Sequence, residues 1–96
     1  MIKKLIEEEM YLHAGNNRIL RSGRIIGIFD LDTSSRGDDT KNYLRKAEKS
    51  GLAESAAEEL PKSFILYEDD DGKTVRVMFS QISTTALVSR TNGELK

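Results

Sequence analysis

Residues 18–30, RILRSGRIIGIFD, join a basic cluster to the main apolar run in the first half of the chain. The run at 25–29 is rich in β-branched side chains, which predicts a strand that is buried on at least one face. Arg18, Arg21 and Arg24 lie at a spacing of three residues on the approach to this strand. Two interpretations are open: the arginines form a solvated rim of the fold, or they form a site for phosphate groups.

The composition bounds the size of the core. The chain has 96 residues, of which 38% are hydrophobic, and it has no tryptophan and no cysteine. A chain of this length forms one domain and buries somewhat more than about 60% of its unfolded surface. Without cysteine, it has neither disulfides nor thiolate metal sites to supplement this thin core. We therefore expect the protein to self-associate as a homo-oligomer.

Charge is segregated along the chain, although the net charge is only −1. Basic side chains concentrate at 18–24 and 41–49, and acidic side chains concentrate at 54–59 and 68–71. This pattern predicts two differently charged surfaces, with a solvated face that has no partner as the simpler interpretation. No stretch approaches the roughly 20 apolar residues of a membrane span, and no secretory signal is recognisable, so we expect a cytoplasmic protein with no membrane partner.

Turn residues divide the first part of the chain into a predicted antiparallel hairpin. Residues 10–13 form the first strand, and a Gly-Asn-Asn cluster forms a tight turn before the second strand. A Ser-Gly pair at 22–23 predicts a bulge or bend, after which the second strand continues to Asp30. Residues 1–9 are interpreted as an N-terminal extension, because a helix this short is marginal in water.

A central helix follows a loop at 31–40, which has no periodicity. Asp38 or Asp39 can cap this helix, and Gly51 is the expected residue beyond its C-terminus. Its narrow apolar stripe predicts a helix that lies on a sheet. The small, acidic segment at 51–60 permits a further helical turn.

A second hairpin and a short helix complete the predicted fold. Strands at 63–68 and 74–80 flank a polar turn, and a Ser-Thr pair at 83–84 offers a cap for the last helix, which precedes a polar tail at 91–96. The sequence therefore predicts a small single-domain α+β fold over 10–90. Its element order is β-β-α-β-β-α, with two antiparallel hairpins packed with a central helix.

The residues that carry enzyme or metal chemistry do not form a recognisable constellation. His13 is the only ordinary general base and has no cysteine or evident serine partner, so we expect no catalytic residue and no enzyme. The acidic run at 69–71 superficially resembles a calcium loop, but the twelfth position of such a loop is Ser80 and Lys73 occupies a ligand position. A solvated turn is therefore expected. Phosphate-binding loop signatures are missing too, and we expect no metal, no cofactor and no small-molecule substrate.

The basic cluster is the main candidate for a site. Guanidinium groups make planar, multidentate contacts with phosphate oxygens, and each contact gives salt-dependent, largely sequence-independent affinity for DNA. A few contacts from one subunit would bind DNA weakly, whereas an oligomer that repeats them gains effective concentration. Self-association would thus complete both the fold and the site.

Two segments, MYLHAGNNRILRSGRIIGIFD at 10–30 and KSFILYEDDDGKTVRVMFSQISTTALVSR at 62–90, carry a resemblance to a known family. Together they resemble the bacterial extracellular-matrix regulators of the RemA/RemB type. The opening MYLHAG and the segment IIGIFDLD are closer to the RemB branch. The resemblance implies a cytoplasmic, ring-forming, DNA-binding regulator of biofilm-matrix genes.

The resemblance also implies roles for individual residues. A DNA-contacting arginine of the family, just before the Ile-Ile strand, corresponds to Arg24, whereas the other two arginines of the cluster rest on the charge argument alone. An adjacent pair of functional arginines in the family falls at about Glu59 and Leu60, where Lys62 is the nearby basic residue. The candidate DNA-contacting residues are Arg24, Arg21, Arg18 and Lys62.

Three functional hypotheses follow from the sequence. The first is an oligomeric regulator of matrix genes that binds DNA. The second is an oligomeric protein-interaction module in the same regulation that does not contact DNA directly. RNA binding comes third, because the chain has few aromatic side chains for base stacking.

Overall fold

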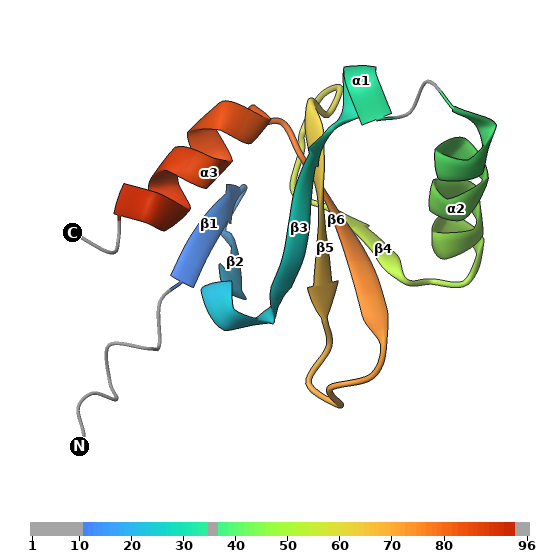
Figure 1. Ribbon diagram of the computed structural model, residues 1–96, viewed down its shortest axis with the longest axis horizontal. Helices are drawn as coiled ribbons and strands as arrows, with labels where there is room; N and C mark the ends of the chain where they lie inside the picture. The colour runs from blue at the N-terminus through green and yellow to red at the C-terminus, as the bar shows by residue number, and fades with distance from the viewer. Residues whose placement is uncertain (1–10, 35–36, 94–96) are drawn as a thin grey trace.

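A four-stranded sheet runs through the middle of the protein and carries a layer of structure on each face (Figure 1). The computed structural model describes residues 11–34 and 37–93. In spatial order, the sheet consists of β3 (Ile25–Asp30), β5 (Ser63–Glu68), β6 (Val75–Ser80) and β4 (Ala53–Ser55). The two covering layers are a hairpin of β1 (Tyr11–Gly15) and β2 (Arg18–Arg21) with helix α3 (Thr84–Gly93), and helix α2 (Asp38–Lys49). The predicted small α+β domain is confirmed.

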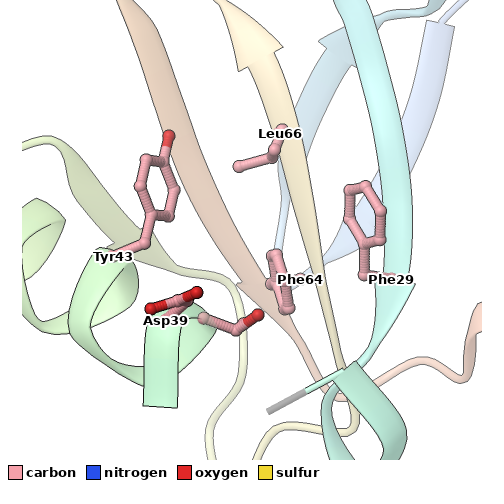
Figure 2. A pocket seen from close by; sticks show the side chains of 6 residues that line it. Phe29, Asp39, Tyr43, Phe64 and Leu66 are labelled. Atoms are coloured by element: carbon pink, nitrogen blue, oxygen red, sulfur yellow. The ribbon is translucent and has the colours of Figure 1, made fainter. Parts of the chain in front are cut away.

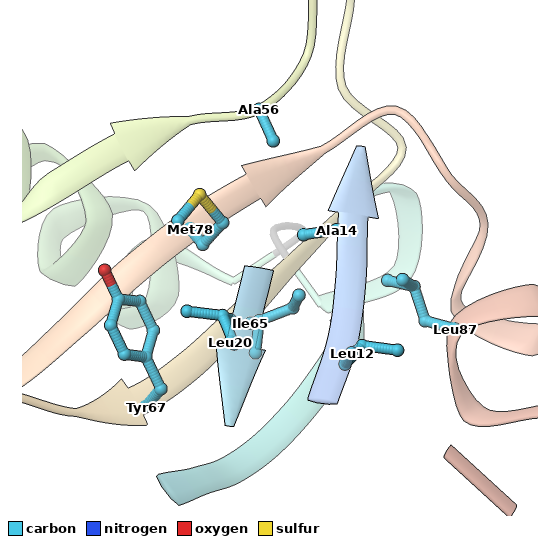
Figure 3. Packing of buried hydrophobic residues seen from close by; sticks show 8 residues of the cluster. All are labelled: Leu12, Ala14, Leu20, Ala56, Ile65, Tyr67, Met78 and Leu87. Atoms are coloured by element: carbon cyan, nitrogen blue, oxygen red, sulfur yellow. The ribbon is translucent and has the colours of Figure 1, made fainter. Parts of the chain in front are cut away.

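Alternation along β5 places the two halves of the core on opposite faces of the sheet. Ile65 and Tyr67 face the hairpin and α3, whereas Phe64 and Leu66 face α2. The sheet therefore divides a small core into two thin layers. The hairpin-side cluster consists of Leu12, Ala14, Leu20, Ala56, Ile65, Tyr67, Met78 and Leu87 (Figure 3). The helix-side cluster consists of Leu44, Ala47, Phe64 and Val77.

The β1–β2 hairpin is confirmed, but the predicted length of its second strand is wrong. Asn16 and Asn17 have φ angles of 48° and 63°, so the hairpin closes through a left-handed turn at the predicted cluster. β2 ends at Arg21, and η2 (Ser22–Arg24) forms one turn of 3-10 helix where a bulge or bend was predicted. β3 then joins the other sheet, because β2 already pairs with β1 and β5 offers β3 an antiparallel partner.

Two short elements differ from the sequence prediction. β4 replaces the helical turn that the sequence permitted; it pairs parallel with β6, and the N–H of Val77 donates to the carbonyl oxygen of Leu52 at 2.9 Å. Helix α1 (Leu31–Ser34) is a single turn inside the predicted loop. The Asp30 carboxylate caps it by accepting the N–H of Thr33 at 2.9 Å. Both elements depend on contacts that hydrophobic periodicity does not report.

The predicted bounds of α2 are confirmed to within two residues, but its predicted cap is wrong. Gly37 is the N-cap residue, and no side chain bonds the free N–H groups there. Asp38 and Asp39 lie in the first turn, where their charges complement the helix dipole. At the other end, Gly51 has a φ of 75° and its N–H donates to the carbonyl oxygen of Glu48 at 3.3 Å, as expected for a glycine that follows a helix.

The last helix, α3, begins at Thr84, directly after the predicted cap residue Ser83, and extends further than predicted. Ser83 Oγ accepts the N–H of Ala86 at 3.2 Å, which identifies Ser83 as the cap. The helix continues to Gly93, so part of the predicted tail at 91–96 is helical. The predicted extension at 1–9 lies outside the described residues. Among the helices of the described residues, none is long and apolar enough to cross a membrane.

Candidate nucleic-acid interface

Two of the four predicted DNA-contacting residues lie at the same groove. Arg21, at the end of β2, and Arg24, in η2, both line a groove of about 370 Å³ between the hairpin and the end of β5. The single turn of η2 brings them together, because it carries the chain from the hairpin to the sheet. The groove is therefore lined by two arginines of the basic cluster that the sequence predicted to contact DNA. It is also lined by Tyr11, Tyr67, Glu68, Asp69 and Asp70.

Arg24 is anchored to the turn between β5 and β6. Its Nη1 donates to the carbonyl oxygen of Asp69 at 2.6 Å and lies 3.7 Å from Asp70 Oδ1. The Arg24 side chain keeps 30% of its surface exposed, and the Asp70 side chain is 99% exposed. Both contacts use one nitrogen of a group that has five N–H donors, so the guanidinium retains the capacity to bind a further acceptor.

The turn between β5 and β6 is held by its own side chains. Asp71 accepts hydrogen bonds from Thr74 Oγ1 (2.5 Å) and from the N–H groups of Lys73 and Thr74 (both 2.8 Å). These bonds, with that of the Thr74 hydroxyl as the largest cause, lower the pKa of Asp71 to about 2. The Asp69 carboxylate accepts a hydrogen bond from Arg76 Nε at 2.7 Å, and this hydrogen bond is the main cause of the lowered pKa of Asp69. The carboxyl groups of Asp69 and Asp71 are therefore ionised at neutral pH.

The other two predicted residues lie elsewhere. Arg18, at the start of β2, pairs with Glu54 of β4, and Nη1 and Oε1 are 2.6 Å apart. Their side chains are 46% and 37% exposed, so the pair adds little stability but reduces the local positive charge. Lys62 precedes β5, whereas Arg24 lies beside the opposite end of that strand, because β3 and β5 are antiparallel. The four basic residues do not form one continuous site.

Sequence reasoning missed the aromatic part of the groove. Tyr11 is 45% exposed and Tyr67 is 8% exposed, and both line the groove beside Arg24. Burial is the main cause that raises the pKa of Tyr67, and the Glu54 carboxylate raises it further. The Tyr67 phenol is therefore neutral and keeps its hydrogen-bond donor. The alternation of β5 signals which face Tyr67 occupies, but no local pattern reveals that Arg24 lies beside it.

Known proteins give no independent identification of the chain. No protein-family model matches it, and a search of curated proteins finds no match either. The site is therefore interpreted from its own geometry and from the resemblance in the sequence.

Proposed function

We propose that the protein is a cytoplasmic regulator of extracellular-matrix gene expression that acts as a homo-oligomer and contacts DNA phosphates through Arg21 and Arg24. The observation that carries this proposal is the position of both arginines at one groove, joined by the η2 turn. The resemblance of residues 10–30 and 62–90 to RemA/RemB-type regulators supports the biological role. The proposal involves no catalysis, metal or cofactor.

The basic residues have unequal parts in the proposed interface. Arg24 is held 2.6 Å from the Asp69 carbonyl oxygen, so it loses little conformational freedom when it binds a phosphate. Arg21 is exposed and lines the same groove, where it would add a second contact with a phosphate. Arg18 and Lys62 do not line the groove, and each would reach DNA as a separate contact.

The acidic turn limits the affinity of a single subunit. Glu68, Asp69 and Asp70 line the same groove, and their carboxylates repel phosphate groups. A phosphate that approaches Arg24 must also compete with Asp70 Oδ1, which lies 3.7 Å from the guanidinium. One subunit would therefore bind DNA weakly. An oligomer that repeats the groove would bind through effective concentration, with affinity that falls steeply as salt rises.

A gel shift with matrix-promoter DNA over about 25–200 mM salt tests the proposal. We expect binding at low salt. Arg24→Ala should weaken it and reduce the salt slope by about one for each phosphate that the variant no longer neutralises. Arg45→Ala is the matched control, because Arg45 is an exposed arginine of α2, on the other side of the sheet. Absence of binding at the lowest salt, or equal effects of the two variants, would contradict the proposal.

A second candidate is an oligomeric protein-interaction module that regulates the same genes without touching DNA. It is favoured by β3, an edge strand of the sheet, on which Ile26 is 54% exposed and Phe29 is 36% exposed. Exposed edges of this kind readily pair with other chains, and a charge on the edge discourages such pairing. Light scattering of the wild type and of Ile26→Lys tests this candidate. An oligomer that the lysine disrupts, together with no DNA binding at low salt, would support it, and a strict monomer at micromolar concentration would exclude both candidates.

A further inference from the structure

An aromatic groove lies between α2 and the β3–β5 side of the sheet (Figure 2). It is on the opposite face of the sheet from the groove of Arg21 and Arg24. Its volume is about 460 Å³, which falls within the roughly 300–1,000 Å³ that small-molecule sites occupy. In Figure 2, Tyr43 and Phe29 stand on two sides of the opening, and the β5 side chains lie between them. The groove is lined by Phe29, Asp39, Thr40, Tyr43, Phe64 and Leu66.

The backbone of β3 makes room for the first wall of this groove. A Cβ atom added at Gly27 would lie 2.7 Å from two atoms of the Phe29 ring, so the ring occupies the space that a side chain at position 27 would fill. From there the Phe29 ring stacks on Phe64, with ring centroids 5.2 Å apart and an interplanar angle of 23°. Phe64 is only 3% exposed and forms the floor. The missing side chain at position 27 therefore leaves room for an aromatic ring that stacks on Phe64 and is still 36% exposed.

The second wall comes from the first turns of α2. Tyr43 is 44% exposed and lines the groove. Leu44 and Ala47 of the same helix are buried in the helix-side core cluster. Asp39 lies one turn earlier on the same helix and supplies the only charged side chain among the six lining residues. Aromatic rings present a negative face, so rings and carboxylate favour the same sign of charge in a bound molecule.

We propose that the aromatic groove binds an organic cation, a guanidinium or ammonium group carried on a short apolar chain. The cationic group would lie between the Tyr43 ring and the Asp39 carboxylate, and the apolar chain would lie over Phe29 and Leu66. The Asp39 carboxylate offsets the positive end of α2, so that Asp39 and the ring faces together disfavour an anion. A neutral apolar molecule would leave the carboxylate unused. The same chemistry is offered by a free small molecule and by a lysine or arginine side chain of another protein. This inference does not depend on DNA binding, because the two grooves lie on opposite faces of the sheet.

Titration of the full chain with butylguanidinium, followed by backbone amide NMR, tests the proposal. Butylurea is the matched neutral probe, because it has nearly the same shape and no charge. We expect butylguanidinium to shift the signals of residues 27–30, 39–43 and 64–66 at millimolar concentration, and butylurea to bind at least about fivefold more weakly. Equal binding of the two probes, or no shifts at these residues, would overturn the proposal.

Two variants in the first turn of α2 test whether a carboxylate inside the groove binds the cation or whether any negative charge at this end of the helix is sufficient. Asp39→Asn should weaken butylguanidinium binding about fivefold to tenfold, because it removes the charged acceptor. Asp38→Asn makes the same charge change in the same turn, but Asp38 does not line the groove, so it should have little effect. Equal losses in both variants would show that the cation responds to the general negative charge of the first turn and not to the groove, and would overturn the proposal.

A third variant tests the aromatic wall. Gly27→Ala should displace the Phe29 ring and weaken binding several-fold, while the amide spectrum of the hairpin side stays unchanged. An alanine that leaves binding intact would refute the assigned role of this wall. A capped Gly-Arg-Gly peptide identifies the source of the cation: much tighter binding than butylguanidinium assigns the groove to a protein side chain, and similar binding assigns it to a free molecule. Shifts at the same residues that depend on protein concentration alone would instead assign the groove to a second copy, against the proposal.

Discussion

Ser80 fastens the arginine-bearing hairpin to the sheet, and its replacement by alanine is the most informative test of the fold. The side chain is fully buried at the end of β6. Its hydroxyl donates to the carbonyl oxygen of Ala14 in β1 at 2.7 Å and accepts the N–H of Ile82 at 3.1 Å. Ser80→Ala removes the hydroxyl and keeps the Cβ atom, so the packing of the residue is nearly preserved. The variant therefore isolates two hydrogen bonds.

The expected cost follows from the hydrogen bonds that the two partners would no longer make. Ala14 is 0% exposed, so its carbonyl oxygen would be left without this donor in a place that water does not reach, at about 1–3 kcal/mol. The Ile82 N–H is partly buried, and removal of its acceptor adds about 0.5–1.5 kcal/mol. A total of about 2–4 kcal/mol is a large part of the roughly 5–14 kcal/mol expected for a domain of this length.

Urea unfolding followed by far-ultraviolet circular dichroism measures this destabilisation directly. With a slope of about 1.5 kcal/mol per molar urea, the midpoint should fall by about 1–3 M. Both proteins must be compared at one concentration, because self-association adds to apparent stability. Ser55→Ala is the control, since the exposed Ser55 hydroxyl bonds the backbone of Ala57, where water can replace it. If Ser80→Ala changes the free energy of unfolding no more than Ser55→Ala does, the hydroxyl does not fasten the hairpin and the argument fails.

Three further predictions concern the core, the acidic turn and the interface. Leu12→Ala should lower the free energy of unfolding by about 2–5 kcal/mol, because Leu12 is fully buried, whereas Ile19→Ala at a 51% exposed position should cost less than about 1 kcal/mol in the same urea experiment. The pKa of Asp71 is about 2 in the folded protein against an ordinary 3.8, so its stabilising effect is present above pH 3.8 and is lost as the pH falls to about 2. Thermal unfolding of the wild type and Asp71→Asn should therefore differ near pH 5 and converge near pH 2, and a difference that is constant with pH would contradict this. Asp70→Asn should strengthen DNA binding about twofold to fivefold at low salt and have little effect at about 0.3 M salt, because it removes a charge 3.7 Å from Arg24. An unchanged gel shift would show that this carboxylate does not compete with phosphate.

Local patterns were sufficient for the elements that carry their own signals. The strand at 63–68 has the predicted bounds, and the helix that ends before Gly51 has them to within two residues, because alternation and a left-handed glycine are readable over a few residues. β4 could not be read in this way. Its three residues, Ala53–Ser55, have no strand preference of their own, and only parallel pairing with β6 makes them a strand. Non-local pairing also explains why the chain leaves the hairpin after Arg21.

The candidate interface depended even more on distant contacts. The spacing of Arg21 and Arg24 made them candidates, and the η2 turn places both at one groove. The acidic groups that face Arg24 come from a turn 45 residues further along the chain, and no local pattern reports that approach. Lys62 was grouped with the arginines because of the family resemblance, but the antiparallel register of β3 and β5 puts it at the other end of the sheet.

The strand β5 links the two proposed sites and determines how they should be tested. Tyr67 lines the groove of Arg24, whereas Phe64 and Leu66 line the aromatic groove, so successive side chains of one strand serve opposite faces. A substitution within β5 would disturb both grooves and the core between them, and its effect on either function would be uninterpretable. Arg24 and Asp39 lie outside β5, on elements that reach only one groove each. If both proposals hold, Arg24→Ala should weaken salt-dependent DNA binding and leave butylguanidinium binding intact, and Asp39→Asn should do the reverse. Impairment of both functions in either variant would mean that the grooves are not separate sites.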